Sequence, residues 1–289
     1  MGKLKEIKQL CNTKASIISV SFSPDGSEVA CGTMSLDIVF CKIYDNTFSI
    51  TTLEYRGGLV KYSPNNGIIA SSIDEDLFLS APGTGKFLQK LEWHKNAILG
   101  IAFSSDGRKI ATGGREELFI YDIETGMPVQ RFSASDIITD IVFTPDGERL
   151  ITSNRDKTLS VWGCKSGVKL HLLKGHTDEV RCVAVHPSAN YAISGGYDKT
   201  LRLWNINYGT EIQHYDCFAP IKSIAFLTDG RHAVCGCHGS IVIVDLKTGE
   251  IIANYNEAES CFYIDVSLHS NLIASGSNNG LFRLWEISF

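Results

Sequence analysis

The stretch GHTDEVRCVAVHPSANYAISGGYDKTLRLWN, residues 175–205, contains one complete example of the pattern that organises this chain. Apolar and polar residues alternate over residues 180–185, a turn sequence follows, and two further short apolar runs lie at 191–194 and 201–204. A period of two residues is typical of β-strands, and no long run has the period of an amphipathic helix. The stretch therefore predicts short strands joined by tight turns.

The same pattern occurs seven times along the chain. Each copy ends its first apolar run in a short turn sequence, and the copies start 40 to 42 residues apart, so that they account for nearly all 289 residues. The copies are SFSPDG from Ser21, KYSPNN from Lys61, AFSSDG from Ala102, VFTPDG from Val142, AVHPSA from Ala184, AFLTDG from Ala225 and DVSLHS from Asp265. A fixed period of this length predicts a repeat architecture.

Each repeat is expected to supply an inner strand at its signature, then a second, a third and a fourth, outer strand. Asp-Gly turns allow the positive φ that a tight antiparallel hairpin requires. The expected second strands are 29–31, 68–71, 109–112, 150–153, 191–194, 232–235 and 272–275. The expected third strands are 38–43, 77–80, 118–123, 159–162, 201–206, 241–246 and 281–287.

The seventh repeat stops at Phe289 without an outer strand, whereas residues 3–10 precede the first inner strand and have no other partner. We therefore expect the N-terminal segment to complete the last sheet. Such closure removes the unpaired strand edges on which chains aggregate.

With a period near 41 and four strands per repeat, the chain resembles the WD-repeat β-propellers. The fifth repeat carries the motif best. By this resemblance, His176, Ser194, Asp198 and Trp204 form a buried, hydrogen-bonded structural tetrad. The resemblance implies an all-β fold: a seven-bladed β-propeller of four-stranded antiparallel blades, one domain over residues 1–289, with residues 3–10 as the outer strand of the last blade.

The motif decays in the other repeats. The fourth repeat keeps Thr152, Asp156 and Trp162, and the third keeps His94 and Thr112. The first, second, sixth and seventh have lost most tetrad positions, so uniform blade stability is not expected.

Composition limits the classes of function. Lys and Arg number 27 against 32 Asp and Glu, a net charge of −5 that offers no global attraction for nucleic acid or an anionic membrane surface. The N-terminal residues have no apolar signal segment, and nine cysteines are an odd count for a disulfide framework. We expect an intracellular protein of the cytoplasm or nucleus, with reduced thiols and no obligate homo-oligomer.

Catalytic and metal-binding interpretations are weaker than structural ones. His176, Asp198 and Ser194 are the residue types of a hydrolase triad, but the resemblance buries them between blades. Cys217 and Cys235 align with the tetrad His and Ser positions, so we expect them to be buried thiols in place of the polar network rather than ligands of a metal. We expect no catalytic residue, metal or cofactor.

What remains is a surface. In propellers of this type one face is lined by the residue five after the tetrad His position and by the residue before the turn Asp. On this count the expected partner-binding face comprises Arg115, Arg155, Arg181, Tyr197, Lys222, His238 and Phe262. Arg and aromatic residues are enriched at binding hot spots.

The sequence therefore predicts a non-catalytic interaction module or scaffold subunit that binds peptide or protein segments on this face. The alternative is a propeller enzyme or ligand sensor with a small molecule in the central channel. That alternative needs repeated carboxylates, His or Lys at channel-facing positions, whereas the inner strands begin with Ile, Leu, Thr, Arg and Phe.

Overall fold

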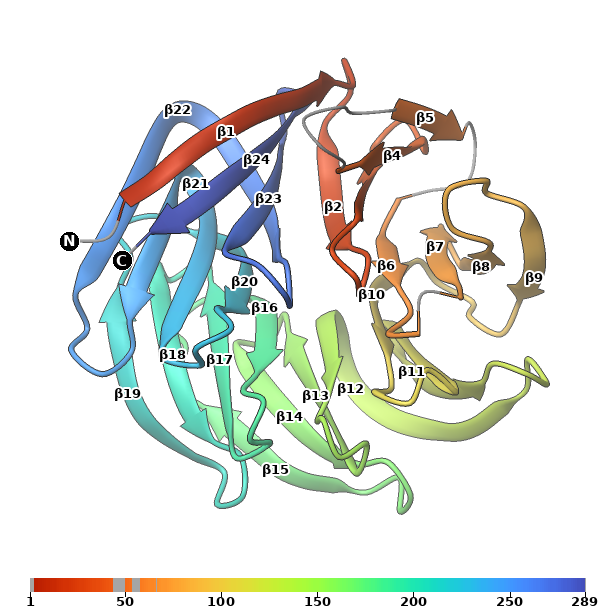
Figure 1. Ribbon diagram of the computed structural model, residues 1–289. Helices are drawn as coiled ribbons and strands as arrows, with labels where there is room; N and C mark the ends of the chain where they lie inside the picture. Colours follow the sequence, from red (N-terminus) through yellow and green to blue (C-terminus); the bar gives the residue numbers. More distant parts are fainter. Residues whose placement is uncertain (1–2, 44–49, 54–57, 66, 289) are drawn as a thin grey trace. The chain divides into compact units, whose positions relative to one another are not determined.

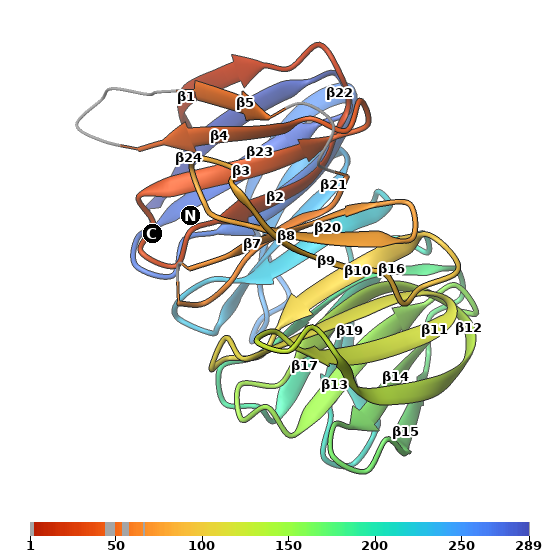
Figure 2. The same ribbon diagram turned by 90° about the vertical axis from the view of Figure 1, so that its right-hand side faces the viewer.

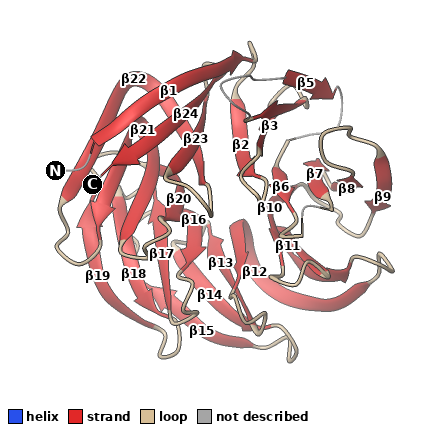
Figure 3. Ribbon diagram, in the orientation of Figure 1, coloured by secondary structure: helices blue, strands red, loops and turns tan. Residues whose placement is uncertain are grey.

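Every secondary-structure element of the described chain is a β-strand. The computed structural model describes residues 3–43, 50–53, 58–65 and 67–288. These residues form twenty-four strands and no helix (Figures 1 and 3). Among them there is accordingly no helix with the length and apolarity to cross a membrane. The all-β prediction is confirmed.

The strands form three four-stranded sheets and two six-stranded sheets. The four-stranded sheets have the orders β2-β3-β4-β5, β6-β7-β8-β9 and β16-β17-β18-β19, and the six-stranded sheets the orders β10 to β15 and β1-β24-β23-β22-β21-β20. The bounds are β1 Lys3–Asn12, β2 Ile17–Phe22, β3 Glu28–Thr33, β4 Ile38–Lys42, β5 Ile50–Leu53, β6 Val60–Tyr62, β7 Ile69–Ile73, β8 Asp76–Ser80, β9 Phe87–Leu91, β10 Ile98–Phe103, β11 Lys109–Asp122, β12 Pro128–Phe143, β13 Arg149–Asn154, β14 Thr158–Gly163, β15 Lys169–Lys174, β16 Val180–Val185, β17 Tyr191–Gly196, β18 Thr200–Asn205, β19 Thr210–Asp216, β20 Ile221–Phe226, β21 His232–Asp245, β22 Ile251–Val266, β23 Leu272–Ser277 and β24 Leu281–Ser288.

The chain divides into two compact units. The first unit comprises Met1–Ile73, Leu77–Lys90 and Ala225–Phe289, and the second comprises Asp74–Asp76 and Leu91–Ile224. In the second unit, β13, β14 and β15 follow one another side by side (Figure 2).

The six-stranded sheets arise because single strands serve two repeats. In the second unit, β12 pairs with β11 over residues 128–137 and with β13 over residues 138–143. In the first unit, β22 pairs with β21 up to Cys261 and with β23 from Phe262 onward. Outer and inner strands of consecutive repeats are thus continuous at these two places.

Two pairs of strands that were expected to be separate are also continuous. The expected strands 109–112 and 118–123 fall in β11, which ends one residue earlier at Asp122, and 232–235 and 241–246 fall in β21, which ends one residue earlier at Asp245. In β11 the pairing with β12 shifts register between Arg115 and Glu117, and Glu116 takes a left-handed φ of 60°. A bulge therefore replaces the turn that was expected, and the strand continues beyond it.

Four inner strands carry a one-residue register shift at the same place. The shifts lie between residues 17 and 19 in β2, 98 and 100 in β10, 138 and 140 in β12, and 180 and 182 in β16. A bulge leaves its extra residue without a cross-strand partner and re-aims its side chain. The extra residues are Ile18, Leu99, Thr139 and Arg181.

Inner strands of consecutive repeats are hydrogen-bonded through side chains. In the second unit, Asp140 of β12 accepts a hydrogen bond from the Val183 amide of β16 at 3.0 Å. In the first unit, Asp265 of β22 accepts one from the Phe22 amide of β2 at 2.8 Å. The second contact joins the last repeat to the first. The Ile17 side chain also packs directly on the β23 backbone there, because a Cβ on Gly276 would lie 2.1 Å from Ile17 Cγ2.

The N-terminal strand completes the last sheet, as predicted. In the first unit, β1 lies antiparallel to β24, with pairs from Lys3 and Ser288 to Asn12 and Leu281 (Figure 1). The strand is two residues longer than the expected 3–10. Leu10 is buried in a cluster with Phe282 and other apolar residues of β2, β3, β4 and β24.

Removal of residues 1–12 should lower the melting temperature and cause aggregation, because it exposes the edge of β24 and uncovers the apolar cluster that Leu10 closes. Thermal unfolding and size-exclusion chromatography measure both effects. The milder substitution Leu10→Ala should cost about 2 to 5 kcal/mol of unfolding free energy. Ile7→Ser, at an exposed position of the same strand, is the control. A monomeric truncation with unchanged stability would show that β1 is dispensable.

Candidate functional site

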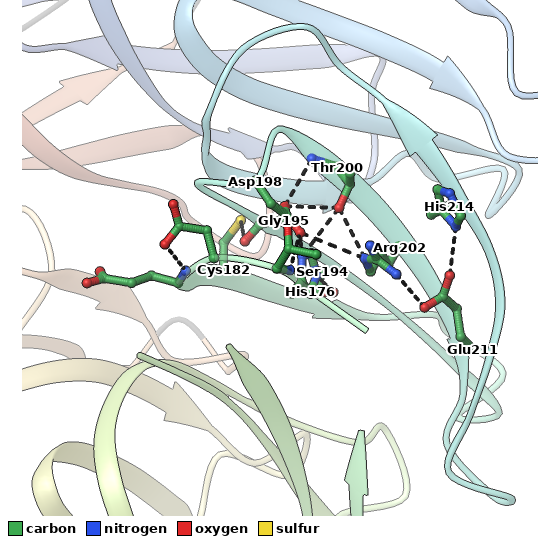
Figure 4. Close-up of polar contacts among 12 residues, drawn as sticks. His176, Cys182, Ser194, Gly195, Asp198, Thr200, Arg202, Glu211 and His214 are labelled. Carbon is green, nitrogen blue, oxygen red and sulfur yellow. Dashed lines mark hydrogen bonds and ion pairs between the residues drawn. The ribbon is translucent and has the colours of Figure 1, made fainter. Parts of the chain in front are cut away.

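A buried chain of hydrogen bonds joins the four tetrad residues of the fifth repeat. The His176 ring lies 2.8 Å through Nδ1 from Asp198 Oδ2 and 2.7 Å through Nε2 from Ser194 Oγ (Figure 4). The Trp204 indole donates to Ser194 Oγ at 2.8 Å. An ionised carboxylate only accepts, so Nδ1 carries the ring proton and Nε2 accepts from the Ser194 hydroxyl. These hydrogen bonds fix the loop before β16 and the turn between β17 and β18 to the strands β17 and β18.

Asp198 organises the turn between β17 and β18. Its carboxylate also accepts from the Thr177 amide at 3.0 Å and from the Thr200 amide and hydroxyl at 3.1 and 2.9 Å. Burial by itself raises the pKa of the Asp198 carboxyl, but the hydrogen bonds that it accepts from His176 and from the Thr177 and Thr200 amides hold that pKa well below its ordinary value. The carboxylate is therefore ionised and fully partnered.

The polar network continues from the tetrad to the outer strand. Arg202 of β18 donates through Nε to Thr200 Oγ1 at 3.1 Å and through Nη1 to Glu211 Oε2 at 2.6 Å. Glu211 of β19 also contacts the exposed His214 ring at 2.8 Å (Figure 4). The network therefore ties three strands of this sheet together.

This arrangement does not suit nucleophilic catalysis. Ser194 is completely buried, and its hydroxyl oxygen already contacts both His176 and Trp204. The side chains of His176 and Asp198 are 0% and 2% exposed. A substrate has no approach to the hydroxyl, so the geometry is that of a structural support.

The third repeat contains a variant of the network that the sequence analysis missed in part. His94 Nε2 lies 2.6 Å from Thr112 Oγ1, and His94 Nδ1 lies 3.3 Å from Glu117. Glu117 stands one position later than the turn Asp of the fifth repeat, and its longer side chain spans the difference. It also accepts from the Lys95 amide at 2.9 Å. The sequence does contain a signal for this network, because Glu117 supplies a carboxylate one position after the place of the turn Asp.

Other repeats keep only part of the network. The Trp162 indole donates to Thr152 at 3.2 Å in the fourth repeat, and Trp285 donates to Ser275 at 2.7 Å in the seventh. In the sixth repeat, Cys217 and Cys235 are buried. No group of three or more metal-ligating side chains occurs in the part of the chain that the structure describes.

Four of the predicted face residues lie together in the second unit. Arg155 Nε donates to Glu179 Oε1 at 2.7 Å, and Arg181 Nη1 lies 3.8 Å from Glu179 Oε2. The Arg181 guanidinium lies 5.5 Å from the centre of the Tyr197 ring, and Lys222 Nζ lies 4.3 Å from the same centre and donates to the phenol oxygen at 2.6 Å. We call Arg155, Glu179, Arg181, Tyr197 and Lys222 the cationic cluster.

The cationic cluster is positioned by the backbone. Arg181 is the extra residue of the β16 bulge, and the Tyr197 amide donates to the Glu179 carbonyl at 2.9 Å. Arg155 follows β13, and its amide donates to the Ile137 carbonyl at 2.9 Å. Side chains from two consecutive repeats and from β20 of the next thus converge on Glu179 and Tyr197.

The remaining predicted face residues are placed differently. Arg115 is exposed on β11 of the second unit. Within the described part of the chain it forms no ion pair with the cationic cluster. His238 is exposed on β21 at the boundary of its bulge, in the first unit.

The assignment of Phe262 to an exposed face is wrong. Phe262 is 0% exposed and packs in an apolar cluster with Trp285 and Ile264. The pairing of β22 with β23 has no register shift, and Phe262 lies opposite Ser277. Without the bulge found in β2, β10, β12 and β16, the residue at this count faces inward.

Comparison with known proteins gives matches along most of the chain. The family model described as "WD domain, G-beta repeat" matches residues 85–122, 126–163 and 167–205. The chain is 25% identical to the guanine nucleotide-binding protein subunit beta of Zea mays over 300 residues, 93% of this chain and 74% of that protein. It is 26% identical to autophagy-related protein 16 of Arabidopsis thaliana over 222 residues, 74% of this chain and 43% of that protein. Eukaryotic translation initiation factor 3 subunit I of Candida albicans is 22% identical over 161 residues, 53% of this chain and 46% of that protein.

Asp198→Ala should lower the free energy of unfolding by about 1 to 3 kcal/mol, because it leaves buried donors without their acceptor. Denaturant unfolding measures the change. Glu148→Ala, at an exposed position of the same unit, is the matched control and should stay within about 0.5 kcal/mol. Equal losses in the two variants would contradict the role assigned to Asp198.

The stabilisation that Asp198 provides should depend on pH. Its pKa is lowered by folding, so the unfolded chain binds a proton first, and the contribution is complete above about pH 5 and is lost as the pH falls below that. Asp198→Asn removes the titrating group. The stability gap between the parent and this variant should therefore be largest near neutral pH and narrow in acid, as measured by denaturant unfolding at several pH values. A gap that does not change with pH would refute the assigned ionisation.

Proposed function

Because the chain belongs to the WD40-repeat family of β-propeller proteins, we propose that it is a non-catalytic interaction subunit of a larger assembly. On this proposal it holds peptide or protein segments of its partners against the cationic cluster. The observation that carries the proposal is the convergence of Arg155, Arg181 and Lys222 on one aromatic ring and one carboxylate. Arg and Tyr are frequent binding hot spots.

The proposal includes the architecture that presents this surface. We propose one domain over residues 1–289, built as seven four-stranded blades in a closed ring. It is supported by strand pairing, since β12 and β22 each divide between two repeats and β1 supplies the outer strand beside β24. The bond from the Phe22 amide to Asp265 supports closure from the inner side.

A scaffold role accords with the remaining observations. Two relatives carry the word subunit in their names, a guanine nucleotide-binding protein subunit beta and an initiation factor 3 subunit I. The polar network of the fifth repeat is committed to structure, which leaves the exposed residues free to vary with the partner. We propose the cytoplasm or nucleus as its location, where a reducing environment suits its buried cysteine thiols.

The test separates binding from folding. The variant Arg181→Glu, Tyr197→Ala, Lys222→Glu should lose its partners in affinity purification from the protein's own cells, while its melting temperature stays close to that of the parent. Arg181, Tyr197 and Lys222 are half-buried, so we expect a smaller loss of stability than core truncation causes, whereas truncation of a hot spot costs about 2 kcal/mol or more of binding free energy. Mass spectrometry identifies the recovered proteins.

The matched control changes the same residue types elsewhere in the second unit. Arg108→Glu, Tyr191→Ala and Lys165→Glu lie in or beside the β10–β11 turn, the start of β17 and the β14–β15 turn. This control should retain the partners. Loss of partners in the control alone would place binding on a different surface, and recovery of no protein by the parent chain would contradict the scaffold proposal.

A further inference from the structure

The cationic cluster carries more positive than negative charge. Arg155 and Arg181 share the single carboxylate of Glu179, at 2.7 and 3.8 Å. Lys222 has no ion pair among the described residues and donates instead to the Tyr197 phenol oxygen. The three cations are therefore opposed by one anion at contact distance.

Arg181 has spare hydrogen-bonding capacity. Its Nε atom is buried and has no hydrogen-bond partner within the described part of the chain, and its side chain is 31% exposed. The contact between Arg181 and Glu179 is too long for a hydrogen bond. The Arg181 guanidinium also contacts the ring of Tyr197. A guanidinium group prefers two parallel bonds to one carboxylate, and Arg181 makes none here.

An exposed aromatic ring lies in the loop that precedes Lys222. Phe218 is 79% exposed and has a left-handed φ of 62°, a conformation that is costly for a bulky side chain. The loop is held to the Tyr197 turn, because the Cys217 amide donates to the Lys199 carbonyl at 2.9 Å. The backbone thus holds an apolar ring in solvent, four residues before Lys222 along the chain.

We propose, on the basis of the function proposed above, that this surface binds an acidic segment of a partner protein in which an Asp or Glu stands near a large apolar side chain. The carboxylate pairs with Arg181 and Lys222, and the apolar side chain covers Phe218. Three cations on a chain of net charge −5 are too few for binding along a nucleic-acid backbone.

The experiment uses the purified full chain and fluorescently labelled probes. The first probe is a pool of short peptides that mix Asp and Glu with Leu and Phe, and the second is the same pool with Asn and Gln in place of the acids. A phosphoserine pool and an oligouridine strand test the competing classes of ligand. We expect the acidic pool to bind most tightly in fluorescence anisotropy, and its affinity to fall as salt is raised.

Variants locate the binding. Arg181→Gln and Lys222→Gln should each weaken binding of the acidic pool about tenfold or more, and Phe218→Ala should weaken it without changing its salt dependence. Arg108→Gln with Lys165→Gln is the matched control and should leave the affinity unchanged. Arg155→Gln, at a side chain that is 58% exposed, provides a second charge variant that does not depend on the packing of Arg181.

Several results would overturn the proposal. These are equal binding of the acidic and amide pools, tighter binding of phosphoserine peptides or oligouridine, no binding of the acidic pool, or equal losses in the control. If the chain still recovers protein partners in the purification test while any of these results holds, only the acidic segment is refuted and the scaffold function stands. If the chain recovers no partner at all, the scaffold function itself fails.

Discussion

The fifth repeat depends on one buried carboxylate with its full set of donors. Asp198 contacts a ring nitrogen, two amides and a hydroxyl, so a charge that would be costly in an apolar interior is compensated at every side. The loop before β16, the turn before β18 and the two central strands must take their observed places for these bonds to form together. The position of Tyr197, which immediately precedes Asp198, follows from the same constraint, and so does the Tyr197 amide bond to Glu179. The turn that contains Asp198 therefore both stabilises the repeat and positions Tyr197 of the cationic cluster.

Other repeats use different means. Glu117 lies one position later than the turn Asp of the fifth repeat and reaches His94 with its longer side chain. The fourth repeat keeps the turn carboxylate, since Asp156 accepts from the Thr158 amide and hydroxyl at 3.1 and 2.6 Å. It adds Asn154, whose amide donates to Thr158 and Ser160 at 3.1 and 3.2 Å. The sixth repeat buries thiols, which demand less hydrogen bonding than a carboxylate. In these repeats the charged network is incomplete, but the polar side chains that remain at its positions have hydrogen-bond partners. The strands are retained.

Much of the strand order follows from the sequence, because a two-residue period and a fixed repeat depend on local chemistry. The pairing of β1 with β24 could be predicted for the same reason, since each was a strand without a neighbour. The fusion of strands in β11 and β21 could not, because a left-handed Glu116 and a bulge replace the expected turn. Phe262 shows the limit most clearly. A count along the chain cannot detect a missing bulge, and one residue of register exchanges the buried and exposed faces.

The bulge also explains why a stable fold can present a variable surface. At Arg181 the extra residue interrupts the pairing of β16 with β17, while Val180 and Cys182 on either side remain buried. The core therefore constrains the neighbours and leaves the bulged side chain to other demands. Where the bulge is absent, as at Phe262, the residue packs in the core and is not exposed for binding. The backbone register of each inner strand therefore decides which residue is available for binding. In the cationic cluster, the β16 bulge positions Arg181 and the Asp198 turn positions Tyr197.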